Sequence, residues 1–109
     1  MEEIGGTLPE TEFLPLICKI FGNSVRFRVL MLLEREPRTF GDLLRSLGVN
    51  PKVLNDSLNI LLKYKLIVKS YPYNVYTLTP AGHVVRQGLI ALGSYVSRIA
   101  GSVPLERRV

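Results

Sequence analysis

The sequence of 109 residues predicts a mainly α-helical fold that contains one small β-hairpin. Several stretches carry apolar residues at helical spacing, and they begin at residues typical of a helix N-cap, such as Asn23, Thr39 and Thr79. Only the segment after Lys65 changes to the alternating pattern of strands. The length suits one domain, large enough to bury a core and small enough to benefit from a partner subunit.

The chain is expected to begin with an arm and two helices. Residues 1–10 carry glycines, a proline, acidic side chains and no periodic pattern, which predicts a flexible acidic arm. In residues 13–21 apolar side chains cover most of a helix circumference, so this helix needs cover on more than one side. Asn23 can cap the next helix, residues 24–35, whose broad apolar face predicts a central core position, and Pro37 ends it.

Residues 39–65 are predicted to form two helices joined by a tight turn. Thr39 can cap the first helix, and Gly48 supplies the left-handed residue that ends it. Asn50 followed by Pro51 starts the second, because the Asn side chain accepts an orphan backbone N–H and proline at the first helical position loses no hydrogen bond. Such a pair is either a helix-turn-helix or an ordinary αα-corner.

The second of these helices, residues 51–65, has two different sides. Its apolar stripe consists of Leu54, Leu58, Leu61 and Leu62, and its polar stripe consists of Lys52, Asp56, Asn59 and Lys63. The leucines are expected to anchor the helix in the core. The polar stripe then points outward, where it either lies in a groove of DNA or is a solvated face.

The remaining chain completes a winged helix. Residues 66–79 are rich in β-branched and aromatic residues around a Pro-Tyr-Asn turn, which predicts a hairpin. Thr79 followed by Pro80 opens a long last helix, residues 80–99, and residues 100–109 are expected to be a flexible basic tail. A helix-turn-helix followed directly by a β-hairpin is a winged helix-turn-helix.

The charge of the chain points toward polyanions. The formal net charge is +5 with a sequence pI of about 9.7. Acidic side chains concentrate in the first twelve residues, so the rest of the chain is more basic than the total suggests. A single cysteine excludes an intramolecular disulfide framework and a thiolate metal cluster within one chain. No secretory signal is recognisable, and His83, Arg86 and Arg98 interrupt the most apolar window, so we expect a soluble, cytoplasmic, nucleoid-associated protein.

The segment Tyr76 to Gly82, with the pattern Tyr-x-Leu-Thr-x-x-Gly, resembles winged helix-turn-helix transcriptional regulators of the HxlR type, and more broadly those of the MarR and ArsR types. The run from Asn50 to Leu54 and the strand Leu66 to Val68 share the likeness, which covers about residues 13–99. The resemblance implies a homodimeric repressor or activator in a domain of residues 11–99. The sequence departs from the pattern of the HxlR type in the position of its cysteine and in its short hairpin, in which Lys69 is the only basic residue.

The resemblance also implies a dimer surface built from the first and last helices. The last helix supports this independently, because its apolar surface is wider than one small domain can cover. The residues expected at the dimer interface are Phe13, Ile17, Ile20, Val85, Leu89, Leu92, Tyr95, Val96 and Ile99. The alternative is a last helix folded back entirely onto its own domain.

The residues expected to bind double-stranded DNA surround the polar helix. They are Arg38, Arg45, Lys52, Asn55, Asp56, Asn59, Lys63, Lys69 and Tyr73. The cations would contact phosphates and position the protein. Asn55 and Asn59 can read adenine in bidentate fashion, and Asp56 can accept from cytosine, whereas Tyr76 is expected to pack across the hairpin.

Other functions receive less support from the sequence. His83 has no second metal ligand nearby in the sequence, and Cys18 lies in an apolar run where a packing role is expected. The sequence therefore predicts no metal site, no cofactor and no enzymatic activity. Two alternatives to a sequence-specific regulator remain: a winged-helix module that binds proteins, and a non-specific DNA-coating protein. A small-molecule effector between the dimer helices and the winged domain is conceivable from the resemblance, but no residue marks one.

Overall fold

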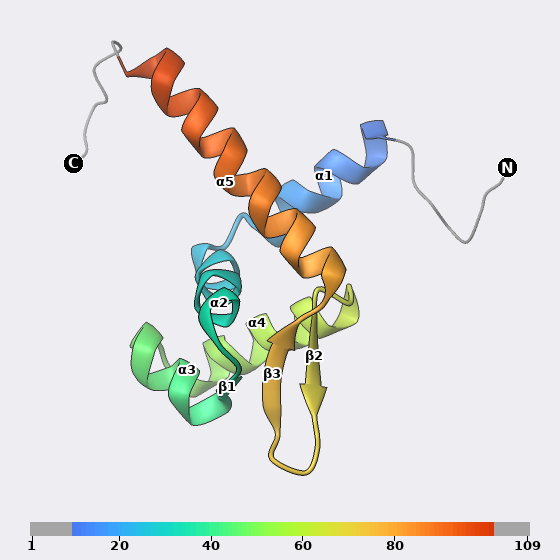
Figure 1. Ribbon diagram of the computed structural model, residues 1–109, viewed down its shortest axis with the longest axis vertical. Helices are drawn as coiled ribbons and strands as arrows, with labels where there is room; N and C mark the ends of the chain where they lie inside the picture. Colours follow the sequence, from blue (N-terminus) through green and yellow to red (C-terminus); the bar gives the residue numbers. More distant parts are fainter. Residues whose placement is uncertain (1–9, 102–109) are drawn as a thin grey trace, which may run out of the picture.

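The computed structural model describes residues 10–101, which form five helices and a three-stranded antiparallel sheet (Figure 1). The elements in chain order are α1 (Glu10–Ile20), α2 (Ser24–Arg35), β1 (Arg38–Thr39), α3 (Phe40–Leu47), α4 (Pro51–Lys63), β2 (Ile67–Ser70), β3 (Val75–Leu78) and α5 (Pro80–Ala100). The predicted order of helices and hairpin is confirmed. The predicted arm falls almost entirely, and the predicted tail largely, outside the described residues.

The core lies where α2, α3 and α4 meet the sheet. Leu30, Leu43 and Leu54, one from each helix, are fully buried there. The sheet contributes Ile67 and Tyr76 to the same cluster, so the packing role predicted for Tyr76 is confirmed. Burial of these side chains ties the hairpin to the helices through one continuous apolar cluster.

The helix starts that were predicted from capping residues are present with the expected chemistry. Asn23 Oδ1 accepts from the Val25 N–H at 2.8 Å, and Asn50 Oδ1 accepts from the Val53 N–H at 2.9 Å. Thr39 forms a reciprocal capping box with Asp42, in which the Asp42 N–H donates to the Thr39 hydroxyl and the Thr39 N–H donates to the carboxylate. These caps fix where each helix begins.

Some boundaries differ from the sequence-based prediction. The first helix begins at Glu10 and includes Pro15, so it is longer at its N-terminus than the apolar run suggests. Helix α4 ends at Lys63 instead of residue 65, because Tyr64 is its C-cap and Lys65 takes the left-handed conformation with φ 60°. That turn lets the chain reverse into β2.

The sheet contains one strand that was not predicted. The two residues of β1 pair antiparallel with β3, with Arg38 opposite Tyr76 and Thr39 opposite Val75. Strand β3 lies in the middle and also pairs with β2, so the order is β1-β3-β2. A two-residue strand leaves no periodic pattern in the sequence, and it exists here only because β3 supplies a neighbour from much later in the chain.

The start of α5 is held against the end of α4 and the start of β2. The Thr79 hydroxyl donates to the Lys65 carbonyl at 2.7 Å and accepts from the Gly82 N–H at 3.0 Å. The Thr79 N–H donates to the Leu66 carbonyl at 3.1 Å. Gly82 is buried beside Leu66, and a Cβ placed on it would lie 2.1 Å from the Leu66 carbonyl oxygen. Only glycine permits this approach.

The second half of α5 leaves the winged domain, whereas Val85 still packs against the core and Arg86 lies 3.9 Å from Glu34. Figure 1 shows the helix running past α1 and extending well beyond the other elements. Gly82 is its only buried residue, and most of the side chains from Ala91 to Ile99 are exposed. The alternative of a last helix folded back onto its own domain is therefore wrong.

Candidate nucleic-acid interface

Helix α4 presents a polar outer face that is held by a buried inner one. Leu54, Leu58 and Leu61 are at most 1% exposed and fix the rotation of the helix about its axis. The polar side chains of the opposite side, Lys52, Asn55, Asp56, Asn59 and Lys63, are all exposed. The predicted two-sided character of this helix is confirmed, and the outer face is free to meet a groove of DNA.

Ion pairs within the helices modify the charge of that face. Lys52 Nζ lies 2.9 Å from Asp56 Oδ2, one helical turn away, and both side chains are largely exposed. Arg45 lies 2.6 Å from Asp42 on α3. The pKa of Asp42 is lowered, chiefly by the backbone hydrogen bond from Thr39 and also by Arg45. Two of the expected phosphate-binding cations therefore carry an acidic neighbour, whereas Lys63 instead lies over the Tyr64 ring at 5.4 Å.

The hairpin presents tyrosines together with one lysine. Lys69 Nζ lies 5.8 Å from the Tyr71 ring centroid and 5.6 Å from that of Tyr76, so two aromatic faces hold the ammonium group. Tyr73, next to the turn residue Asn74, is 80% exposed. An exposed phenol at the tip and a positioned ammonium group on the strand are the groups that this wing can offer to a phosphate backbone.

Arg38 departs from the expected role. Its side chain is 16% exposed, it lies 3.6 Å from Glu36, and its Nε atom is buried without a hydrogen-bond partner. The residue belongs to β1, whose pairing with β3 draws the side chain down onto the sheet. A guanidinium in this position is poorly placed to meet phosphate, so we leave Arg38 out of the interface.

Sequence reasoning missed Lys65 and Val53. Lys65 is exposed in the left-handed turn after α4, and Val53 is 37% exposed near the start of that helix. The signal for Lys65 was its place between a helix pattern and a strand pattern, where a turn must expose the side chain. Val53 lies outside both stripes predicted for this helix, so no signal in the sequence marked it.

An apolar groove with a volume of about 270 Å³ lies between α1 and α5. It is lined by Phe13, Leu14, Ile17, Val84, Val85, Gly88, Leu89 and Leu92. Farther along α5, Tyr95, Val96 and Ile99 are between 49% and 60% exposed. Ile20 differs from the other residues expected at a dimer interface, because it is 2% exposed and packs in the core of its own chain.

Cys18 and His83 are the two residues whose chemistry could indicate a redox or metal site. Cys18 is exposed on α1, so its expected packing role within the domain is wrong. His83 Nδ1 lies 2.8 Å from Glu34 Oε1, which connects α5 to α2. Within residues 10–101, no group of three or more His, Cys, Asp or Glu side chains could hold a metal ion. No helix in this part of the chain is long and apolar enough to cross a membrane.

The three-helix core, the exposed face of α4 and the following hairpin define a winged helix-turn-helix protein (Figure 1). Residues 23–69, from the cap of α2 into β2, match the family described as bacterial regulatory protein, arsR family. Residues 23–69 are thus similar to an arsR-type helix-turn-helix, and the described part of the chain has the winged helix-turn-helix fold. No curated protein matches the chain.

Solved structures of regulators share this fold. A MarR-family transcriptional regulator from Enterococcus faecalis V583 is similar with a TM-score of 0.76 and 23% identity, covering 91% of this chain and 96% of that one. The transcriptional repressor BigR from Xylella fastidiosa is similar with a TM-score of 0.65 and 18% identity, and the match covers 91% of this chain and 92% of that one. The reduced form of the regulator YodB from B. subtilis is similar with a TM-score of 0.68 and 16% identity, and the match covers 84% of this chain and 93% of that one. At these identities the likeness establishes the fold, and the HxlR subtype stays a prediction.

Proposed function

We propose that this regulator binds double-stranded DNA sequence-specifically as a homodimer, with α4 in the major groove and the β2–β3 hairpin as the wing. The observation that carries the proposal is the fixed rotation of α4, whose inner leucines are buried while its amides and cations face solvent. A helix presented in this way has the width and the donor and acceptor groups that the major groove accepts.

Base reading and phosphate contact are assigned to different side chains. Asn59 and Asn55 lie one helical turn apart on α4, and each amide can donate to and accept from adenine. Asp56 can accept from cytosine, but its ion pair with Lys52 has to open or tilt first. Lys63, Lys69, Arg45 and the Tyr73 hydroxyl are assigned to phosphates, which set register and salt dependence without carrying sequence information.

The homodimer is supported by the apolar surface that one chain leaves uncovered. Helix α5 has 21 residues and spans roughly 31 Å, but its residues from Ala91 to Ile99 are all exposed. Leu92, Tyr95 and Ile99 are each more than half exposed, and the groove beside α1 is almost purely apolar in its lining. Monomeric proteins rarely expose a continuous surface of this kind, so a second copy of α1 and α5 is its natural cover.

Two copies related by a twofold axis would present two α4 helices at a fixed separation. The expected target is therefore an inverted repeat with half-sites about one turn of DNA, roughly 34–36 Å, apart. The site of action that follows is chromosomal DNA in the cytoplasm.

Selection of bound duplexes from a random pool tests the proposal most directly. We expect enrichment of an inverted repeat, bound by a particle with the mass of two chains. The selected duplex is then titrated at several salt concentrations with Lys63→Ala and with Lys19→Ala, an exposed lysine of α1, as the control. Lys63→Ala should weaken binding and reduce the slope of log affinity against log salt by about 1.

The alternatives give different results in the same experiment. Equal binding to selected and random duplexes indicates a non-specific coating protein. Absence of binding to every duplex indicates a module that binds protein, and the assignment of α4 as a reading helix is then wrong.

A further inference from the structure

An exposed valine lies among the polar side chains of α4. Val53 is 37% exposed and belongs to the first turn of the helix, where its N–H donates to the Asn50 side chain at 2.9 Å. Valine strongly prefers one side-chain rotamer in a helix, so its two methyl groups are held in one direction. A fixed apolar surface is therefore part of the face that the proposed function places in the major groove.

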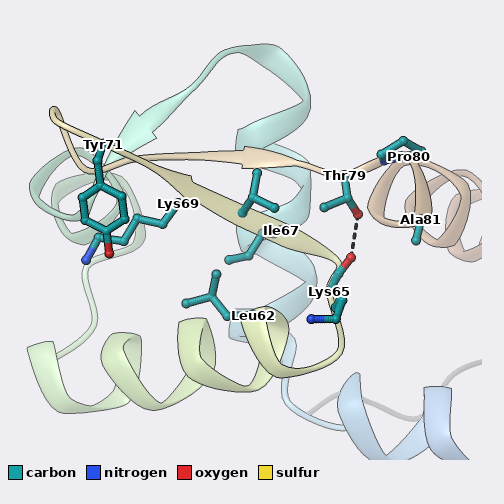
Figure 2. A pocket seen from close by; sticks show the side chains of 9 residues that line it. Leu62, Lys65, Ile67, Lys69, Tyr71, Thr79, Pro80 and Ala81 are labelled. Carbon is teal, nitrogen blue, oxygen red and sulfur yellow. Dashed lines mark hydrogen bonds between the residues drawn. The ribbon is translucent and has the colours of Figure 1, made fainter.

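The packing of α4 shows on which side of this face Val53 lies. Leu62 points from α4 toward strand β2, where Ile67 lies (Figure 2). Asn55 precedes Leu62 by seven residues, about two turns, so both lie on the side of the helix that faces the hairpin. Val53 is about 160° away from Asn55 around the helix axis. The exposed arc of α4 thus has an amide at its edge near the hairpin and a valine at its opposite edge, with the polar stripe between them.

The charges beside Val53 largely cancel. Lys52 Nζ lies 2.9 Å from Asp56 Oδ2, so the start of α4 offers little net charge to a phosphate. Phosphates are bound chiefly by net positive charge. This end of the helix is therefore better suited to the edges of the bases than to the DNA backbone.

An A·T pair matches the two edges of this arc. In the major groove the pair presents the N7 acceptor and the N6 donor of adenine on one side and the 5-methyl group of thymine on the other, whereas a G·C pair offers no methyl group. Asn55 can bond to the adenine while Val53 contacts the methyl group. The two residues differ by about 3 Å in rise along α4, close to the step of about 3.4 Å between base pairs, so they reach the same pair or neighbouring pairs.

We propose that Val53 is a specificity-determining residue that contacts the 5-methyl group of thymine, while Asn55 binds adenine from the side of the hairpin. Each half-site therefore contains A·T pairs beneath the start of α4. This inference rests on the proposed function, because it requires α4 to lie in the major groove.

Replacement of thymine by deoxyuridine tests the contact, because it removes the methyl group and keeps every hydrogen-bonding group of the base. The duplex selected from the random pool is prepared with each thymine replaced in turn, at the same position of both half-sites. Fluorescence anisotropy then measures the affinity of the full chain at one salt concentration. One replacement should weaken binding by wild type roughly fifteenfold, which is about fourfold for each half-site and corresponds to the burial of one methyl-sized group.

Val53→Ala extends the test to the protein. This variant should bind the thymine duplex roughly fifteenfold more weakly than wild type and should bind the thymine and deoxyuridine duplexes equally. Because Val53 is exposed and alanine favours helix, the variant is expected to fold. Ile60→Val is the matched control, since Ile60 follows Val53 by seven residues on the same side of α4 but packs against the core. The control should retain the full sensitivity to deoxyuridine.

Two results would overturn the role of Val53 and leave the proposed function intact: selected half-sites without thymine, or sequence-specific binding that is indifferent to every replacement. The role is also wrong if Val53→Ala retains the sensitivity, because another residue then contacts the methyl group. If no duplex is selected at all, the proposed function is refuted, and the assignment of Val53 falls with it.

Discussion

Gly82→Ala should destabilise the protein strongly although it adds a single methyl group to a helix. The new Cβ would meet the Leu66 carbonyl oxygen at 2.1 Å, so α5 has to move by about 1.3 Å or more to reach ordinary contact, which begins at 3.4 Å. This movement strains or breaks the bonds from Thr79 to the carbonyls of Leu66 and Lys65, each contributing about 1 kcal/mol. Overpacking adds about 1–3 kcal/mol, and the better helix propensity of alanine offsets about 1 kcal/mol.

The net expectation is a loss of about 2–4 kcal/mol in the free energy of unfolding. Urea denaturation followed by far-ultraviolet circular dichroism measures it. Gly41→Ala is the matched control, since Gly41 also lies in the first turn of a threonine-capped helix but meets only the Arg45 side chain, at 3.5 Å, and the Thr39 hydroxyl. It should stabilise by about 0.5–1 kcal/mol. If both variants raised the midpoint, the close approach at Gly82 would not be a real constraint.

Three further predictions follow from packing, charge and surface. Leu54→Ala, at a position with 0% exposure, should cost about 2–5 kcal/mol in urea denaturation. The pKa of Asp42 is lowered below 3.8, so its carboxylate stabilises the fold above that pH, and this stability is lost as pH falls through the folded-state pKa. The difference in thermal stability between wild type and Asp42→Asn should therefore shrink on acidification, which thermal melts at several pH values measure. Val96→Glu should convert the proposed dimer into a monomer by light scattering, whereas Gln87→Glu on the same helix is the control.

The helix starts were predictable because each depends on neighbouring residues alone. Asn50 and Pro51 fix the beginning of α4 through one side-chain hydrogen bond and one missing N–H, whatever the rest of the chain does. The same holds for Thr79 and Pro80 at α5. The outward face of α4 was predictable too, since the spacing of its leucines leaves one orientation that buries them.

Features set by distant contacts were not predictable. The pairing of Arg38 with Tyr76 depends on residues far apart in sequence, and the arginine that the sequence predicts as an exposed cation is mostly buried. Likewise Ile20 and Cys18 both lie in one apolar run, yet the first is buried in the core and the second is exposed. Which side of α1 meets the domain depends on residues much later in the chain, such as Tyr64, Leu66 and Val85, and the local pattern does not determine it.

The shortest strand has a mechanical consequence. Thr39 is at once a partner of Val75 in the sheet and the residue that caps α3, so the wing and the helix supporting the reader share one hinge-free joint. In the proposed binding mode, the distance between the hairpin and α4 is therefore held by the fold itself, because residues of both pack in one core. We therefore expect the protein to discriminate between duplexes by the spacing of neighbouring grooves as well as by base sequence.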